Sequence, residues 1–207
     1  MDHIDVVIYI NLDHRTDRRA EFEAECRRIG IPEEKVIRFP AIKTDPSIAG
    51  VGCSRSHAAV LQYAHDQGFK NALICEDDCN FHADPAVFHE RLARFFNELG
   101  PCGQWDAIQL AHMVYESTPY NDYLSVARRA SNAACYLVNA HMFEPLSKTI
   151  ADSAEPLERT GQHWIYQNDV AWCQYMPAGR WYLFTEKLAY QRPSYSDLSH
   201  TYVPEPR

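Results

Sequence analysis

The chain has 207 residues, 46% of them hydrophobic and 12% aromatic, so we expect one folded globular domain over residues 1–207 rather than a disordered chain. The formal net charge of −8 at pH 7 argues against nucleic acid or an anionic membrane surface as the main partner, because both are negatively charged. No apolar stretch in the sequence is long enough to span a bilayer.

The first half of the chain alternates predicted strands with predicted helices. Short apolar runs predict strands at 5–11, 36–39, 72–75 and 105–110. Apolar residues three and four apart predict helices at 16–29, from residue 54 or 56 to 67, and at 85–99, with a loop over 42–54. This alternation favours an α/β fold with a mixed, mostly parallel sheet flanked by helices.

The second half is less regular. Apolar runs predict strands at 123–128, 134–138, 181–184 and 188–190. Helices are predicted at 139–150 and from residue 168 or 169 to 176, and Pro145 should kink the first of these or delay its start. The polar stretch 152–167 between them is predicted to be a loop.

Three carboxylates, Glu76, Asp77 and Asp78, follow the apolar run 72–75 directly. Charges are costly to bury, so this pattern predicts a buried strand whose tip emerges into a cleft. Three acids at one tip repel each other unless a cation lies among them, and hard oxygen ligands suit Mg²⁺ or Mn²⁺ together with the phosphates of a substrate. The alternative interpretation is a solvated acidic turn.

The turn after the first strand is a second candidate. Ligands of parallel α/β sheets bind at the carboxyl ends of the strands, so Asn11 should lie in the same cleft as the acids. Arg15, Arg18 and Arg19 follow it and suit a nucleotide diphosphate. Alternatively, these arginines only form ion pairs with neighbouring acids of the same helix, Asp17, Glu21 and Glu23.

Ser56 and His57 stand near the expected start of the second helix, after a glycine-containing loop. The segment matches neither the Walker motif nor the dinucleotide-binding motif. His57 falls on the apolar face of its helix, which by itself favours a core position over a catalytic one.

Cysteine usage and the N-terminus predict a cytoplasmic protein. The first five residues lack the basic start and apolar run of a signal peptide. The seven cysteines are odd in number and never spaced Cys-x-x-Cys, so we expect most to be reduced, buried thiols. Peripheral contact with the inner face of a membrane remains open.

Taken in order, these motifs resemble glycosyltransferase family 25, which contains lipopolysaccharide and lipooligosaccharide β-galactosyltransferases and is similar to the collagen galactosyltransferases. The residues that carry the resemblance are Ile10 to Asp13, Arg15, Asp17 to Arg19, Gly52-Cys53, Ser56-His57, Glu76 to Asp78, Ser131 to Val138, Ala140, Asp169, Gln191 and Ser196-Asp197. The chain departs from the family where Asn168-Asp169 replaces an expected Pro-Val-Asp, and it is short for the family.

The resemblance implies a GT-A-like fold and transfer of a hexose, galactose or glucose, from a nucleoside-diphosphate sugar such as UDP-hexose to a saccharide or glycolipid acceptor. It implies a divalent metal, Mn²⁺ or Mg²⁺, at Glu76, Asp77 and Asp78, with Asp78 the best direct ligand. An inverting reaction needs a base for the acceptor proton, for which Asp169 is the first candidate and Asp197 the second. The expected substrate-binding residues are Asn11, Arg15, Arg18, Arg19, Ser56, His57 and Gln191.

Two other classes of function fit the same residues. A Mg²⁺-dependent phosphohydrolase or nucleotidyltransferase shares the need for a metal and phosphates, and an inactive module could bind a sugar nucleotide without transferring it. The aromatic residues between 164 and 195 suit stacking on the sugars of an acceptor, but they suit a protein core or a dimer surface equally well.

Overall fold

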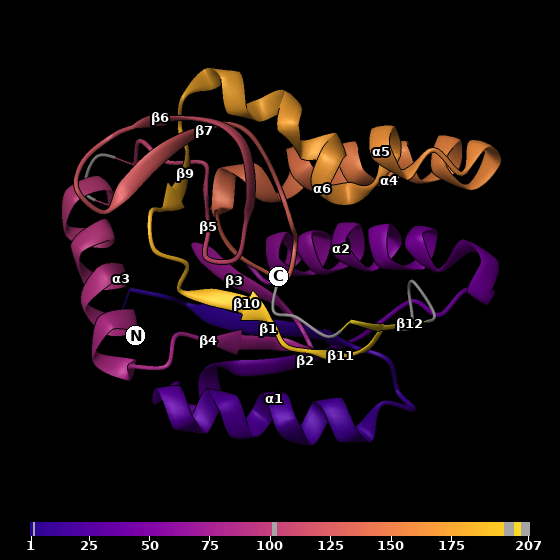
Figure 1. The fold of residues 1–207 in the computed structure, drawn as a ribbon, viewed down its shortest axis with the longest axis horizontal. Helices are drawn as coiled ribbons and strands as arrows, with labels where there is room; N and C mark the ends of the chain where they lie inside the picture. Colours follow the sequence, from indigo (N-terminus) through magenta and orange to yellow (C-terminus); the bar gives the residue numbers. More distant parts are fainter. Residues whose placement is uncertain (2, 101–102, 197–200, 204–207) are drawn as a thin grey trace.

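The computed structural model describes residues 1, 3–100, 103–196 and 201–203. An eight-stranded sheet forms its centre (Figure 1). In spatial order its strands are β2 (Val36–Pro40), β1 (Val6–Asn11), β3 (Asn71–Glu76), β8 (Cys135–Asn139), β5 (Ala107–Gln109), β9 (Trp181–Phe184), β7 (Leu124–Ser131) and β6 (Met113–Pro119). Two small antiparallel sheets pair β10 (Ala189–Gln191) with β4 (Cys79–Phe81), and β11 (Ser194–Ser196) with β12 (Thr201–Val203).

Most strands of the large sheet run in one direction. β1 lies parallel to β2 and β3, and β5 lies parallel to β9. β8 and β7 run antiparallel to the strands beside them, including the edge strand β6. The predicted mixed, mostly parallel sheet of an α/β fold is therefore confirmed.

Helices cover both faces of the sheet. Their bounds are α1 (Thr16–Ile29), α2 (Ala49–Asp66), α3 (Pro85–Leu99), α4 (Phe143–Thr160), α5 (His163–Tyr166) and α6 (Asn168–Ala171), with 3-10 turns at Glu33–Lys35, Pro46–Ile48, Ala140–Met142 and Trp172–Ala178. Alternate residues of β1 divide between two apolar cores. Val7 packs with α1 and α3, whereas Ile8 packs with α2 and α4. Figure 1 shows α1 below the sheet and α2 and α4 above it.

The second helix begins earlier than predicted. α2 starts at Ala49, so the expected loop over 42–54 is wrong beyond residue 48. Asp45 accepts a hydrogen bond from the Ser47 backbone N–H and starts a 3-10 turn that runs directly into α2. Gly52 fits inside the helix because a Cβ atom there would lie 2.7 Å from the carbonyl oxygen of Ile42. The glycine lets the incoming chain pack against the helix.

The predicted loop over 152–167 is also wrong. α4 begins at Phe143, after a 3-10 turn, so Pro145 delays the helix start as expected and lies in its first turn. The helix then continues through Pro156 to Thr160 and ends at Gly161, whose φ is 66°. Ala154 and Leu157 keep its apolar face in contact with α2 through Val51, and this packing outweighs the cost of the internal proline.

Four observed strands were not predicted from the sequence: β4, β6, β11 and β12. β4, β11 and β12 have only three residues each, and the residues of β6 are all exposed, so it lacks a buried apolar face. The six cysteines that the structure describes are free, and four of them are buried, in agreement with the prediction of reduced thiols.

Trp172 and Trp181 belong to the core, whereas Trp164 is 61% exposed. Among the described helices, none is both long and apolar enough to cross a membrane.

Candidate functional site

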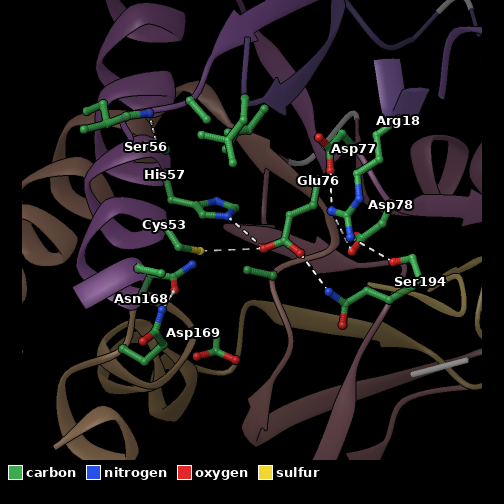
Figure 2. A pocket seen from close by; sticks show the side chains of 18 of the residues that line it. Arg18, Cys53, Ser56, His57, Glu76, Asp77, Asp78, Asn168, Asp169 and Ser194 are labelled. Atoms are coloured by element: carbon green, nitrogen blue, oxygen red, sulfur yellow. Dashed lines mark hydrogen bonds and ion pairs between the residues drawn. The ribbon is translucent and has the colours of Figure 1, made fainter. Parts of the chain in front are cut away.

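A pocket of about 600 Å³ opens beside the ends of β1 and β3. Figure 2 shows its side chains, which come from α1, from the first half of α2, from the turn after β3, from α6 and from the chain after β10. These segments are far apart in the sequence. They meet because the parallel strands β1 and β3 end at the same edge of the sheet.

The acidic residues form the tight turn between β3 and β4. Glu76 is the last residue of β3, and Asp77 and Asp78 are only 6% and 8% exposed because the strands on both sides of them are buried. Asn11, at the end of the neighbouring strand β1, donates a hydrogen bond from Nδ2 to Asp77 Oδ2 at 2.7 Å. The turn after β1 and the acidic turn therefore lie together, as predicted, although Asn11 holds Asp77 and is not among the described pocket-lining residues.

The cation found among these acids is the guanidinium group of Arg18. Its Nη1 atom lies 2.8 Å from Asp77 Oδ1 and 3.2 Å from Asp78 Oδ2. Its Nη2 atom donates to Ser194 Oγ at 2.8 Å and to the Tyr195 carbonyl oxygen at 2.7 Å. Burial would lower the pKa of Arg18, but attraction by Asp78 and Asp77 outweighs it and raises that pKa. Arg18 thus ties α1 to the acidic turn and to β11, rather than extending freely towards a diphosphate.

Asp78 has an unsatisfied carboxylate oxygen. Its Oδ1 atom is buried and has no hydrogen-bond partner among the residues that the structure describes. Burial and, secondly, repulsion by Glu76 raise the pKa of Asp78 to about 7. A divalent cation would satisfy both the orphaned oxygen and the excess negative charge. Asp78 therefore fits the predicted role of direct metal ligand.

The other two predicted metal ligands already have partners. Both oxygens of Asp77 are engaged, by Asn11 and by Arg18. Glu76 Oε2 accepts a hydrogen bond from Gln191 Nε2 at 2.9 Å, which brings the predicted residue Gln191 into the site. Burial would raise the pKa of Glu76, but the hydrogen bond and charge of His57 outweigh it and lower that pKa. Metal binding by Glu76 and Asp77 stays a prediction.

His57 occupies both a core position and the site. Its side chain is 1% exposed, as the apolar face of its helix predicts, yet it lines the pocket. Its Nε2 atom lies 3.3 Å from Glu76 Oε1, and its Nδ1 atom lies 2.9 Å from the Tyr136 hydroxyl.

Ser56 also lines the pocket, where its hydroxyl donates to the Gly52 carbonyl and accepts from the Ile42 N–H. This serine fixes the segment after β2 against α2.

Asp169, the first candidate for the base, lies in α6 and lines the pocket, and its role as the base stays a prediction. Its Oδ2 atom accepts a hydrogen bond from the backbone N–H of Asn132 at 2.9 Å, at a position where Asn132 has a φ of 83°. Burial and, among the charged neighbours, Glu76 raise the pKa of Asp169 above its usual range. Asp197, the second candidate, lies outside the described residues.

Arg15 and Arg19 are not among the described residues that line the pocket. Arg15 forms an ion pair with Asp17, and Arg19 forms one with Glu23, each with an N···O distance of 2.9 Å. The alternative prediction for these two arginines, ion pairs with nearby acids, therefore describes the contacts that they make. Instead, Lys43 and Arg192 line the pocket, and neither residue was predicted from the sequence. Arg192 adjoins the predicted Gln191, so its position could have been suspected, whereas Lys43 lies in a loop without any recognisable motif.

Comparison by sequence gives no relatives: no family model matches the chain, and no curated protein matches it. By structure the chain is similar to UDP-glucose pyrophosphorylase complexed with UDP-glucose, with a TM-score of 0.51 and 11% identity over 91% of this chain and 93% of that one. For apo UDP-glucose pyrophosphorylase the TM-score is 0.50 and the sequence identity 13%, over 90% of this chain and 76% of that one. For a glycosyltransferase involved in the glycosylation of the major capsid of PBCV-1, the TM-score is 0.48 and the identity 12%, over 86% of this chain and 80% of that one.

At such low identities these similarities concern the fold. The chain has an α/β fold similar to that of UDP-glucose pyrophosphorylase, in agreement with the GT-A-like fold that the resemblance implies.

Proposed function

We propose that the protein is a metal-dependent hexosyltransferase that uses a nucleoside-diphosphate sugar, UDP-glucose or UDP-galactose first, and a saccharide or glycolipid acceptor. The observation that carries the proposal is the buried Asp78 Oδ1 atom, which lacks a partner among the described residues and belongs to a pocket at the carboxyl ends of β1 and β3. The ordered resemblance to glycosyltransferase family 25 supports sugar transfer in lipopolysaccharide-type biosynthesis.

The donor would bind with its diphosphate near Asp78. A Mn²⁺ or Mg²⁺ ion held by this residue would neutralise the charge that develops on the leaving diphosphate. Lys43 lines the same pocket and adds positive charge for the phosphates. Arg192 also lines the pocket, where its guanidinium group forms an ion pair with Glu21. Gln191 donates a hydrogen bond to Glu76 and so holds the carboxylate at the end of β3 in place. A pyrophosphorylase of similar fold is complexed with UDP-glucose, which supports this class of donor.

Asp169 would take the proton from the acceptor hydroxyl in an inverting transfer. Its carboxylate lines the pocket, and burial with Glu76 nearby raises its pKa, which makes it a stronger base than an ordinary aspartate. The hydrogen bond from Asn132 holds one of its oxygens, which leaves the other oxygen for the acceptor.

The fold also suits a second function, a sugar-1-phosphate nucleotidyltransferase, because both pyrophosphorylase structures share it. Incubation of radiolabelled UDP-hexose with Mn²⁺ and candidate acceptors separates the possibilities. A glycosylated product with UDP supports the proposal. Hexose 1-phosphate formed on addition of pyrophosphate identifies the nucleotidyltransferase, free hexose or UMP identifies a hydrolase, and thermal stabilisation without turnover identifies a binding module. Any of these last three results contradicts the proposal.

A further inference from the structure

Three side chains of the kinds that bind Zn²⁺, a thiol, an imidazole and a carboxylate, converge at the side of the pocket. One ligand atom each of Cys53, His57 and Glu76 lies within 4.8 Å of the other two. Figure 2 shows the three groups pointing towards a common point, with Cys53 and His57 on α2 and Glu76 at the end of β3. Cys53 and His57 are four residues apart, so they lie on one face of the helix.

The distances match the edges of a tetrahedral coordination sphere. His57 Nε2 lies 3.3 Å from Glu76 Oε1, and Cys53 Sγ lies 3.8 Å from the same oxygen. A tetrahedral Zn²⁺ ion with metal–ligand bonds of about 2.3 Å to sulfur and about 2.1 Å to nitrogen and oxygen separates its ligands by about 3.4 Å for N···O and about 3.6 Å for S···O. The two distances to Glu76 are therefore close to these separations, and the third pair, Cys53 with His57, lies within 4.8 Å.

The hydrogen-bond partners of these ligands are also typical of a metal site. Metal-binding histidines use one ring nitrogen for the ion and hydrogen-bond the other, and His57 Nδ1 lies 2.9 Å from the buried Tyr136 hydroxyl. The second oxygen of Glu76 accepts a hydrogen bond from Gln191 at 2.9 Å. Tyr136 and Gln191 therefore orient the histidine and the carboxylate towards Cys53.

We propose that Cys53, His57 and Glu76 form a binding site for a transition-metal ion of the Zn²⁺ class, separate from the hard-cation site at Asp78. Coordination replaces the thiol proton of Cys53, which leaves to solvent. Three protein ligands leave one position of a four-coordinate ion for a water molecule or a substrate oxygen from the pocket, the arrangement of catalytic rather than structural zinc. The proposal does not depend on the hexosyltransferase function.

A second cluster of thiols makes a useful comparison. Cys75, Cys79 and Cys135 also bring their sulfur atoms within 4.8 Å of one another, and all three are fully buried in the core. None of the three is among the described residues that line the pocket, and Cys75 and Cys135 already contact each other at 3.6 Å. This cluster offers no pocket-facing position for a further ligand, so it serves as the internal control for metal binding by thiols.

Titration of the metal-free protein with Co²⁺, followed by absorption spectroscopy, tests the proposal. Tetrahedral Co²⁺ bound to a thiolate gives visible d–d bands and a near-ultraviolet charge-transfer band, and Zn²⁺ should displace it. We expect one Co²⁺ per chain, loss of the charge-transfer band in Cys53→Ser, and Co²⁺ binding about 10- to 100-fold weaker in Tyr136→Phe. Cys79→Ser and Cys173→Ser should leave the spectrum unchanged.

The same titration can overturn the proposal. Absence of a tetrahedral spectrum means that Cys53, His57 and Glu76 form only a hydrogen-bonded group. A band that survives Cys53→Ser, or one that disappears in Cys79→Ser, means that Co²⁺ binds elsewhere. His57→Gln provides a second variant if Cys53→Ser fails to fold, and it should lose the tetrahedral d–d bands. Asp78→Asn should keep the Co²⁺ spectrum even if hexosyl transfer is never detected, which separates this proposal from the proposed function.

Discussion

The guanidinium group of Arg18 lies 2.8 Å from the carboxylate of Asp77, and both side chains are only 8% exposed. A buried ion pair gives little net stability compared with apolar packing, but loss of one partner leaves an uncompensated charge in a low-dielectric environment. Arg18 contacts Asp78 as well, so it compensates two buried carboxylates at once. The acidic turn of the candidate site therefore depends on α1 for its position.

Arg18→Ala should lower the free energy of unfolding by about 3 to 5 kcal/mol, because Asp77 and Asp78 remain buried without their counter-ion. Urea unfolding monitored by circular dichroism measures the change. Arg19→Ala is the matched control, since Arg19 forms an exposed pair with Glu23 on the same helix and its loss should change stability little. Equal stability of the two variants would contradict the role given to Arg18.

Asp78→Asn should reduce metal-dependent hexosyl transfer by about a hundredfold or more, because it removes the proposed direct ligand. The fold should remain intact, since the amide has nearly the same shape and one carboxylate oxygen of Asp78 lacks a partner among the described residues. Stabilisation of the protein by Mn²⁺ with UDP, measured by thermal shift, should also be lost. The control is Asp84→Asn, at the N-cap of α3, where asparagine caps as well as aspartate.

The pH profile of kcat/KM should have an acidic limb above the ordinary aspartate range of about 3.9. A base acts in its deprotonated form, and burial together with Glu76 raises the pKa of Asp169, so activity should fall as the pH decreases through that raised value. Asp169→Asn should abolish transfer but keep donor binding, as isothermal titration calorimetry with UDP can show.

The same raised pKa has a consequence for stability. The folded state binds the proton of Asp169 more tightly than the unfolded state does, so this residue reduces stability as the pH rises from its unfolded pKa through its folded pKa. At pH 7 Asp169→Asn should therefore be at least as stable as the parent protein, because asparagine keeps an acceptor for the Asn132 N–H. A clearly destabilised Asp169→Asn would point to a structural role instead.

Lys43→Ala should weaken binding of UDP in the presence of Mn²⁺ by about tenfold, since a charge-assisted contact with phosphate is lost. Lys43 is exposed and lines the pocket, so the fold should not depend on it. The control is Lys148→Ala on α4, whose side chain pairs with Asp152 and is not among the described pocket-lining residues. Equal UDP affinity of both variants would exclude Lys43 from the donor site.

Local sequence patterns predicted the parts of the molecule that depend on local chemistry. The apolar run before Glu76 specifies β3, and the acids after it specify a turn at the pocket, because charges and apolar groups separate in any fold. Polarity alone was less informative. The polar stretch 152–167 suggested a loop, but the contact of Leu157 with α2 keeps the chain helical through Pro156.

The remaining features of the site depend on long-range packing. The contact of Arg18 with Asp77 spans 59 residues, and the contact of Gln191 with Glu76 spans 115. Arg15 precedes α1 and Arg19 lies on its exposed side, whereas Arg18 lies four residues before Phe22 on the buried face of the helix. The spacing could therefore have singled out Arg18, but only the fold shows that it contacts Asp77. The sequence likewise places Cys53 and His57 on one helix face, but only the fold brings Glu76 to them.

Anomalous diffraction from Mn²⁺ in a crystal soaked with UDP-hexose tests the central claim most directly, because it locates the ion relative to the carboxylates and the diphosphate. The account predicts an anomalous peak about 2.1 to 2.3 Å from an oxygen of Asp78, with diphosphate oxygens completing the coordination. A bound UDP-hexose without a metal peak at Asp78 would contradict it.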